Sequence, residues 1–246
     1  MKIIKNELSD MKAVKQDIDD NSNLPFIPSH PLPIRFSMYI VGAPGSGKTS
    51  FWNSLLMNKK NKAYYGFFSK IFLISGSLNT LPQRLLKQLP DHQKYNNFND
   101  ELLSDILEYL YDEENDQYLL VLDDVIKDLK KSDELLKTYL NRRHICHNPD
   151  GDNKGQLSII TTSQKFSLLS VPYRNSCSHF VIYKCSNKVE CDKIRDELMY
   201  DLTREEQDEV FELCWSEPYS FLFIDINKDK NNGKYYQKFN KIIFND

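Results

Sequence analysis

The segment GAPGSGKT, from Gly42 to Thr49, carries the clearest chemical signal in the sequence. It fits the pattern G-x-x-x-x-G-K-[ST], in which consecutive backbone N–H groups converge on phosphate. Gly42, Gly45 and Gly47 allow the backbone angles that this convergence needs. We expect Lys48 to reach the β- and γ-phosphates of ATP and the Thr49 hydroxyl to ligate Mg²⁺. The predicted nucleotide-binding residues are Gly42, Ala43, Pro44, Gly45, Ser46, Gly47, Lys48, Thr49 and Ser50.

The residues on either side supply the context that this loop requires. Residues 35–41 are rich in β-branched and aromatic side chains, which predicts a strand. Residues 50–58 have helical spacing of apolar side chains. A strand, a glycine turn and a helix together indicate a phosphate-binding loop rather than a chance glycine turn.

A second acidic motif follows a buried strand. Residues 118–124, YLLVLDD, are an apolar run that ends in two carboxylates. We expect Asp123 to hold Mg²⁺, directly or through water, as a Walker B acid. Asp124 is positioned to act as the general base toward the attacking water. Asp124 could instead be a helix cap or a solvated acid.

The third polar position is Gln164, which closes the apolar strand predicted for residues 156–164. An amide both donates and accepts hydrogen bonds, so Gln164 could contact the γ-phosphate and the water and sense whether the phosphate is present. The alternative is an ordinary surface glutamine.

Phosphoryl transfer also calls for a positive charge near the developing transition-state charge. The candidates are Arg142 and Arg143, in the segment NRRH, and Arg174. Each could instead be a solvated or helix-capping residue. If one is an arginine finger, a neighbouring subunit could supply it, which would couple hydrolysis to assembly.

Strand and helix patterns alternate through the rest of the chain. Further strands are predicted at residues 70–75, 178–184, 219–227 and 234–244, and helices at 99–114, 132–144, 188–200 and 203–214. This order predicts an α/β fold with a mostly parallel central sheet covered by helices on both faces, closed by a C-terminal β-hairpin. Residues 1–33 are expected to form an N-terminal arm with a proline-rich linker, and residues 34–246 one P-loop ATPase domain.

Composition narrows the classes of protein. The 246 residues carry a formal charge of −3, so the net charge gives no indication of nucleic-acid binding. A local basic surface would be sufficient for such binding. Five scattered cysteines do not make a disulfide framework. We find neither a signal peptide nor an apolar run long enough to span a bilayer, and we therefore expect an intracellular protein without membrane insertion.

The motifs GAPGSGKT, YLLVLDD and NRRH, in this order and followed by the strand that ends at Gln164, resemble those of a known family. This family is the genome-packaging ATPases of large DNA viruses and virophages, including the poxvirus type, within the FtsK–HerA superfamily of P-loop NTPases. The resemblance covers about residues 33–244. It implies a RecA/FtsK–HerA-like fold and a homo-oligomeric ring that uses ATP to push double-stranded DNA into a capsid. It also implies a capsid or portal-vertex partner, a place at virion assembly sites in the host cytoplasm, a sensor role for Gln164 and a trans-acting finger in NRRH. Many superfamily members have Asp-Glu where this chain has Asp123-Asp124.

Other readings of the sequence remain open beside this one. A P-loop small-molecule kinase would need an arginine-rich lid, and we find no such segment. A non-translocating assembly factor could hold nucleotide as a structural clamp. The histidines and cysteines around 144–147 and 177–179 lack the spacing of a structural zinc site. The five lysines within residues 226–246 could contact DNA phosphates or simply face water.

Overall fold

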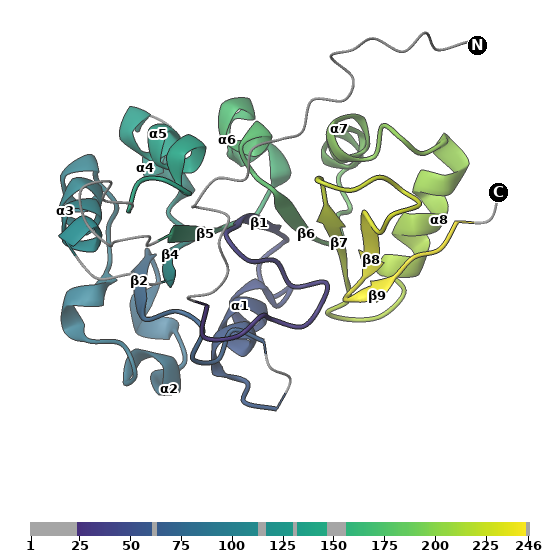
Figure 1. Cartoon of the computed structure of the whole chain (residues 1–246). Coiled ribbons are helices and arrows are strands. Elements are labelled where there is room, and N and C mark those ends of the chain that lie inside the picture. Colours follow the sequence, from purple (N-terminus) through teal and green to yellow (C-terminus); the bar gives the residue numbers. More distant parts are fainter. Residues whose placement is uncertain (1–23, 61–62, 113–116, 130–131, 147–155, 245–246) are drawn as a thin grey trace, which may run out of the picture.

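The computed structural model describes residues 24–60, 63–112, 117–129, 132–146 and 156–244. These residues form a nine-stranded sheet with helices on both faces (Figure 1). The strands are β1 Ser37–Val41, β2 Lys70–Ser75, β3 Lys94–Tyr95, β4 Gln117–Asp123, β5 Gln156–Ser163, β6 His179–Tyr183, β7 Phe221–Asp225, β8 Tyr235–Gln237 and β9 Asn240–Lys241. The α-helices are α1 Lys48–Met57, α2 Gln83–Leu86, α3 Asp100–Asp112, α4 Ile126–Leu129, α5 Asp133–Asn141, α6 Val171–Asn175, α7 Lys188–Leu198 and α8 Arg204–Cys214.

The strand order is β3-β2-β4-β5-β1-β6-β7-β8-β9. All pairs from β3 to β6 are parallel, and the pairs from β6 to β9 are antiparallel. Strands that are buried on both faces have continuous apolar sequences, and this explains why they could be predicted from the sequence. The predicted mostly parallel α/β sheet is confirmed.

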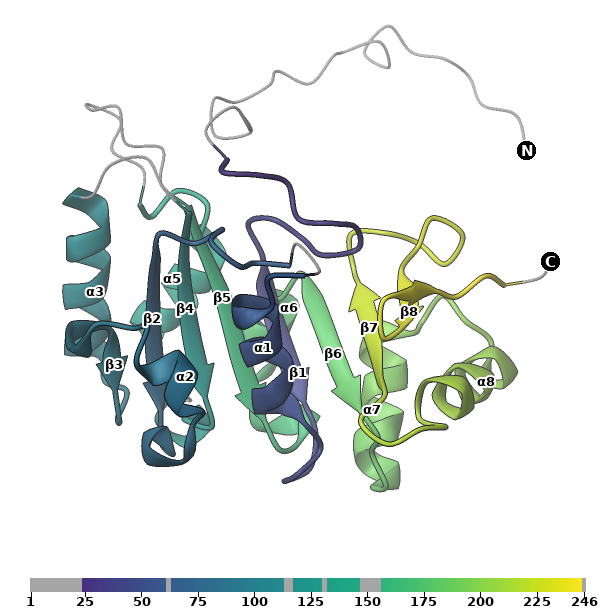
Figure 2. The ribbon, with the colours of Figure 1, turned by 90° about the horizontal axis from the view of Figure 1, so that it is seen from below.

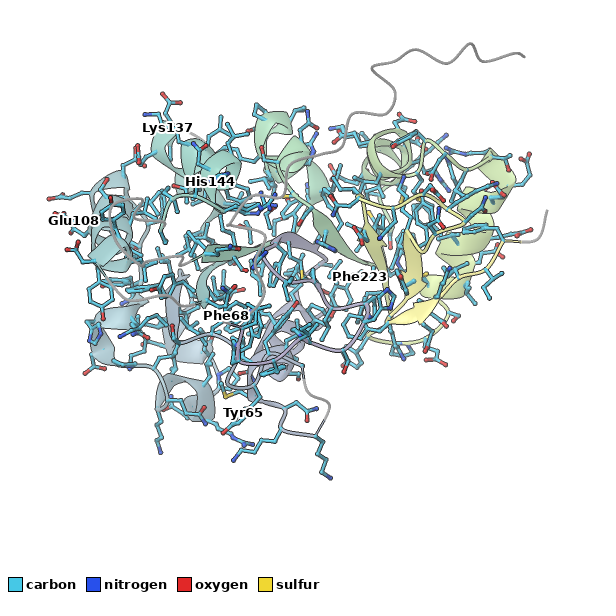
Figure 3. The ribbon with its side chains drawn as sticks, in the orientation of Figure 1. Tyr65, Phe68, Glu108, Lys137, His144 and Phe223 are labelled. Atoms are coloured by element: carbon cyan, nitrogen blue, oxygen red, sulfur yellow. The ribbon has the colours of Figure 1, made fainter. Side chains whose placement is uncertain are left out.

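Two hydrophobic clusters hold the helices against the two faces of the sheet. Along β1 the side chains alternate between them: Tyr39 and Val41 join the cluster of α3, α5, α6 and α7, whereas Met38 and Ile40 join that of α1 and α2. Figure 3 shows the same division, with His144 and Lys137 on the side of α5 and Tyr65 and Phe68 on the side of α1. The sheet is therefore the middle layer of three.

Side-chain caps fix where several helices begin. Ser132 accepts a hydrogen bond from the Leu135 N–H at the start of α5, and Asn187 accepts one from Glu190 at the start of α7. Thr203 opens α8 with a capping box. These caps set the helix starts to within a residue of the sequence prediction, whereas α5 ends at Asn141, three residues before the predicted end.

The C-terminal strands correct one detail of the prediction. β7 and β8 pair antiparallel, as expected of a terminal hairpin. The segment 234–244, however, is not one strand, because Lys238 has a φ of 55° and turns the chain between β8 and β9. A single residue in the left-handed region is enough to break a strand.

The described part of the N-terminal region, residues 24–34, packs on the domain. Phe26 contacts the ring of Phe67, and the hydroxyl of Tyr64 donates a hydrogen bond to the carbonyl of Pro33. His30 lies against Tyr236 of β8. Figures 1 and 2 show this segment passing beside β7. The proline-rich segment thus lies against its own domain. Residues 1–23 of the expected arm lie outside the described residues, and the boundary at residue 33 remains a prediction.

Candidate nucleotide-binding site

The glycine-rich loop leaves β1 at the carboxyl edge of the sheet and enters α1. Gly47 is the N-cap of α1 and has a φ of 102°, a conformation that favours glycine. At Gly42 a Cβ would lie 2.4 Å from Ser46 Oγ and 2.8 Å from Tyr183 Cβ, so no side chain fits there. Both glycines are therefore required by the shape of the loop, and the start of α1 points at its centre.

Lys48 lies within the loop. Its ammonium donates to the carbonyl oxygens of Gly42, at 2.6 Å, and Ala43, at 3.1 Å. Burial lowers the pKa of Lys48, while the nearby charges of Asp124 and Asp123 oppose this change. The ammonium is therefore held within the loop, close enough to both acids to interact with their charges.

Asp123 is buried at the end of β4 and accepts three side-chain hydrogen bonds. Thr162 donates to Oδ1 at 2.8 Å and the Trp52 indole donates to the same atom at 3.3 Å. Ser75 donates to Oδ2 at 3.3 Å. Burial and the charge of Asp124 raise the pKa of Asp123, whereas the three hydrogen-bond donors lower it. Burial is the largest effect, so the pKa is raised overall. The three donors fix the orientation of the carboxylate.

Asp124 follows in an unusual backbone conformation. Its φ is 55°, which is uncommon for a residue other than glycine, although aspartate is enriched there. Its N–H donates to Thr162 Oγ1 at 3.1 Å, and its side chain is exposed. Such conformations persist where the surrounding structure holds them, often at functional sites. The turn leaves one acid buried and its neighbour open to solvent.

The strand order brings Gln164 to the same edge. β5 lies between β4 and β1, and the Gly42 N–H donates to the Ser163 carbonyl at 3.1 Å. Gln164, the next residue, is exposed. Gln164 therefore lies at the end of β5, the strand between the one that ends at Asp123 and the one that leads into the glycine-rich loop. The sensor role of Gln164 remains a prediction.

The residues expected to hold Mg²⁺ suit that ion chemically. A threonine hydroxyl and a carboxylate are hard oxygen ligands, and the Thr49 side chain is partly exposed at the start of α1. Among the donors described, Asp123 Oδ2 accepts from Ser75 alone and retains lone pairs for another contact. Over the described part of the chain, no group of three or more His, Cys, Asp or Glu could hold a metal. His147, one of the histidines considered for zinc, lies outside the described residues.

Arg142 and Arg143 lie at the other edge of the sheet. The Arg142 carbonyl accepts a hydrogen bond from the N–H of Leu157, the second residue of β5. The Arg142 guanidinium is partly buried and donates to the Tyr139 carbonyl at 3.1 Å. Parallel strands all start at one edge, so these arginines are remote from the glycine-rich loop of their own chain. A finger role for them is possible only in a neighbouring subunit.

Arg174 has a structural explanation. Its side chain is 6% exposed and makes two hydrogen bonds to the Glu197 carboxylate, at 2.7 and 2.6 Å. It also donates to the Leu169 carbonyl and lies 4.8 Å from the centre of the Phe166 ring. Breaking this arrangement would leave a charge without its partner. These contacts indicate a structural role for Arg174, and the finger role stays a prediction for Arg142 and Arg143.

The sequence reading missed the residues that surround the predicted ones. Trp52, Ser75 and Thr162 hold Asp123, and Tyr183 and Tyr219 lie against the glycine-rich loop. One signal was available: Ser75 and Thr162 are polar residues at the ends of apolar strands. This signal does not identify their partner, because Trp52, Ser75 and Thr162 are 39 to 71 residues away from Asp123 along the chain.

The C-terminal lysines mostly have partners within the chain. Lys230 pairs with Glu206, Lys238 with Glu217 and the buried Lys234 with Asp201. Lys241 donates to the carbonyl of Asn231. These contacts favour a structural role for the segment over a free basic surface.

The loop, the acid pair and the position of β5 between β1 and β4 define this chain as a P-loop NTPase. Residues 30–200 match the family described as Poxvirus A32 protein, and the chain belongs to that family. The predicted resemblance to the poxvirus type is thereby confirmed at the level of the family. A sequence comparison with curated proteins gave no match. Among the described residues, no helix is long and apolar enough to cross a lipid bilayer.

Solved structures of viral packaging enzymes share the fold. The genome packaging NTPase B204 from Sulfolobus turreted icosahedral virus 2, in complex with sulfate, superposes with a TM-score of 0.59 at 15% identity, over 86% of this chain and all of that one. Its complex with ATP-gammaS gives 0.53 at 14% identity, over 84% and 98%. B204, described as the DNA-packaging ATPase from Sulfolobus Turreted Icosahedral Virus, gives 0.54 at 15% identity, over 79% and 94%.

Proposed function

We propose that this chain is an ATP-driven motor that moves double-stranded DNA into a viral capsid. The observation that carries the proposal is the convergence of Lys48 and the Asp123–Asp124 pair at one edge of the sheet. The family match and the fold of the viral packaging enzymes supply the context for this site. A loop that only clamped nucleotide would not need an exposed acid beside a buried one.

Each of these residues has a separate role in ATP hydrolysis. The loop N–H groups and the Lys48 ammonium bind and orient the phosphates. Thr49 and Asp123 would hold Mg²⁺, which neutralises charge on the phosphate oxygens when bound. The exposed Asp124 carboxylate is free to take a proton from water, and Gln164 orients that water or contacts the phosphate.

The position of the remaining arginines supports action in an oligomer. Arg142 and Arg143 lie by the start of β5, at the edge opposite their own glycine-rich loop. In a ring, that edge of one subunit could face the nucleotide of the next. A finger supplied in this way would make hydrolysis depend on assembly. We propose such a homo-oligomeric ring, working with a capsid protein at virion assembly sites in the host cytoplasm.

The test is steady-state Mg-ATP hydrolysis by the full chain, alone and with linear double-stranded DNA, single-stranded DNA or RNA. We expect turnover that duplex DNA stimulates selectively. The Lys48→Ala variant should lower turnover by about a hundredfold or more, because the phosphates lose their main charged partner. Unchanged hydrolysis in this variant would refute the site, and equal rates with every nucleic acid would refute the translocase.

A further inference from the structure

A cavity of about 880 Å³ lies beside the glycine-rich loop and extends along α1. Gly47, Lys48 and Thr49 line one end of it. Ser29–Leu32 of the proline-rich segment line another part, together with residues near the end of α1 such as Asn58. Its volume is within the range of small-molecule sites, about 300–1,000 Å³. The cavity is therefore continuous with the phosphate-binding loop.

Aromatic rings form much of one wall. Phe51 of α1 contacts Phe221 of β7 with ring centres 4.9 Å apart, and both contact Phe239. Tyr183, at the end of β6, lies 5.5 Å from Phe221 and points its hydroxyl at the Gly47 carbonyl. This packed cluster is a rigid apolar surface next to the loop.

Tyr219 differs from these rings because it is exposed. Its side chain is 71% exposed although it lines the cavity, and its φ is 60°. A Cβ placed on Gly47 would lie 3.3 Å from the Tyr219 ring, so the ring lies directly beside the loop. An exposed aromatic ring that lines a mostly apolar cavity is a surface on which a planar group can stack.

We propose that this cavity takes the base and ribose of the nucleotide, with Tyr219 as the ring that stacks on the base. The inference rests on the proposed function, because it assumes that the phosphates bind at the glycine-rich loop. The triphosphate then extends from Lys48, and the nucleoside lies over α1 between Tyr219 and the aromatic wall. Ser29–Leu32 line the cavity, so the proline-rich segment contributes to the site in cis.

The proposal is tested by comparing ATP with inorganic tripolyphosphate, which carries the phosphates but no nucleoside. The dissociation constants of both are measured by calorimetry for the full chain and four variants. Tyr219→Ala should weaken ATP binding by about tenfold, a typical effect of losing one base–aromatic stack. It should leave tripolyphosphate binding unchanged. Tyr219→Phe should restore ATP binding, because the ring alone is needed.

The matched control is Tyr200→Ala, since Tyr200 is 75% exposed and does not line the cavity. It should bind ATP like the wild type, and a loss equal to that of Tyr219→Ala would refute the specific role of Tyr219. ATP affinity that is unchanged in Tyr219→Ala would also overturn the base site. Loss of tripolyphosphate binding in Lys48→Ala tests the phosphate site separately. The ATPase proposal can therefore survive a failure of the base site.

Discussion

The Thr162 hydroxyl lies 2.8 Å from the Asp123 carboxylate and donates a hydrogen bond to it. The same oxygen accepts the N–H of Asp124 at 3.1 Å. One side chain on β5 therefore fixes both members of the acid pair that ends β4. A hydroxyl can do this because it donates and accepts at once.

Replacing Thr162 tests this linkage. Thr162→Val keeps the shape but removes both hydrogen bonds, which leaves Asp123 less well oriented and the Asp124 N–H without its partner. We expect kcat for Mg-ATP to fall by about tenfold to a hundredfold, the value of a hydrogen bond to a charged group. Thr162→Ser should retain most of the activity, and equal activity in the valine variant would show that the linkage has no catalytic role.

Asp124→Asn separates nucleotide binding from hydrolysis. The amide cannot accept the proton from water, so kcat should fall by about a hundredfold or more. The dissociation constant for Mg-ATP should change little, because Asp123 and the loop remain. Both quantities are measured on one preparation, by steady-state kinetics and calorimetry. Loss of binding together with activity would assign Asp124 to the metal instead.

Subunit mixing tests the finger in trans. Arg143→Ala subunits keep an intact phosphate site, and Lys48→Ala subunits keep an intact arginine. If Arg143 acts across an interface, mixtures of the two inactive variants should recover part of the wild-type turnover at shared interfaces. The same experiment with Arg142→Ala decides between the two arginines. Mixtures as inactive as their components would leave the trans finger without support.

Arg174 should behave as a structural residue. Arg174→Ala removes both hydrogen bonds to Glu197, which is 30% exposed and so remains partly solvated. We expect the free energy of unfolding to fall by about 2 kcal/mol, as measured by urea denaturation. Arg84→Ala, at an exposed arginine, is the matched control and should change stability much less. An Arg174→Ala protein as stable as the wild type would contradict the structural role.

Glu190 should contribute stability that depends on pH. Burial by itself would raise the pKa of Glu190. Hydrogen bonds from the Ser167 N–H, at 2.9 Å, and from the Ser167 hydroxyl outweigh this effect, so the pKa is lowered. A carboxyl with a lowered folded-state pKa stabilises the fold above its unfolded pKa of about 4.3 and loses that contribution in acid.

The measurement compares wild type with Glu190→Gln. Urea unfolding at pH 7 should show the wild type as more stable, by about 1 kcal/mol for a charge-assisted bond. The difference should shrink as the pH falls below about 4.3. A difference that is independent of pH would show that the charge of Glu190 is not responsible.

The elements predicted best are those that short-range patterns control. The loop Gly42–Thr49 and the strands β2 and β4 were identified within a residue or two, because apolar runs and glycine spacing act over a few residues. The short elements between residues 78 and 95 were not predicted. Their helices and strand have four residues or fewer, too few for a periodic pattern to emerge.

The sequence by itself determined the chemistry: a phosphate-binding loop, two consecutive acids and the order of a parallel α/β fold. Only the tertiary structure decided which side chains support those acids, because Trp52, Ser75 and Thr162 reach Asp123 through strand order and register. It likewise placed Arg174 in an ion pair and Tyr219 beside the loop. Contacts between residues far apart in sequence depend on how the elements pack, and local spacing does not encode that packing.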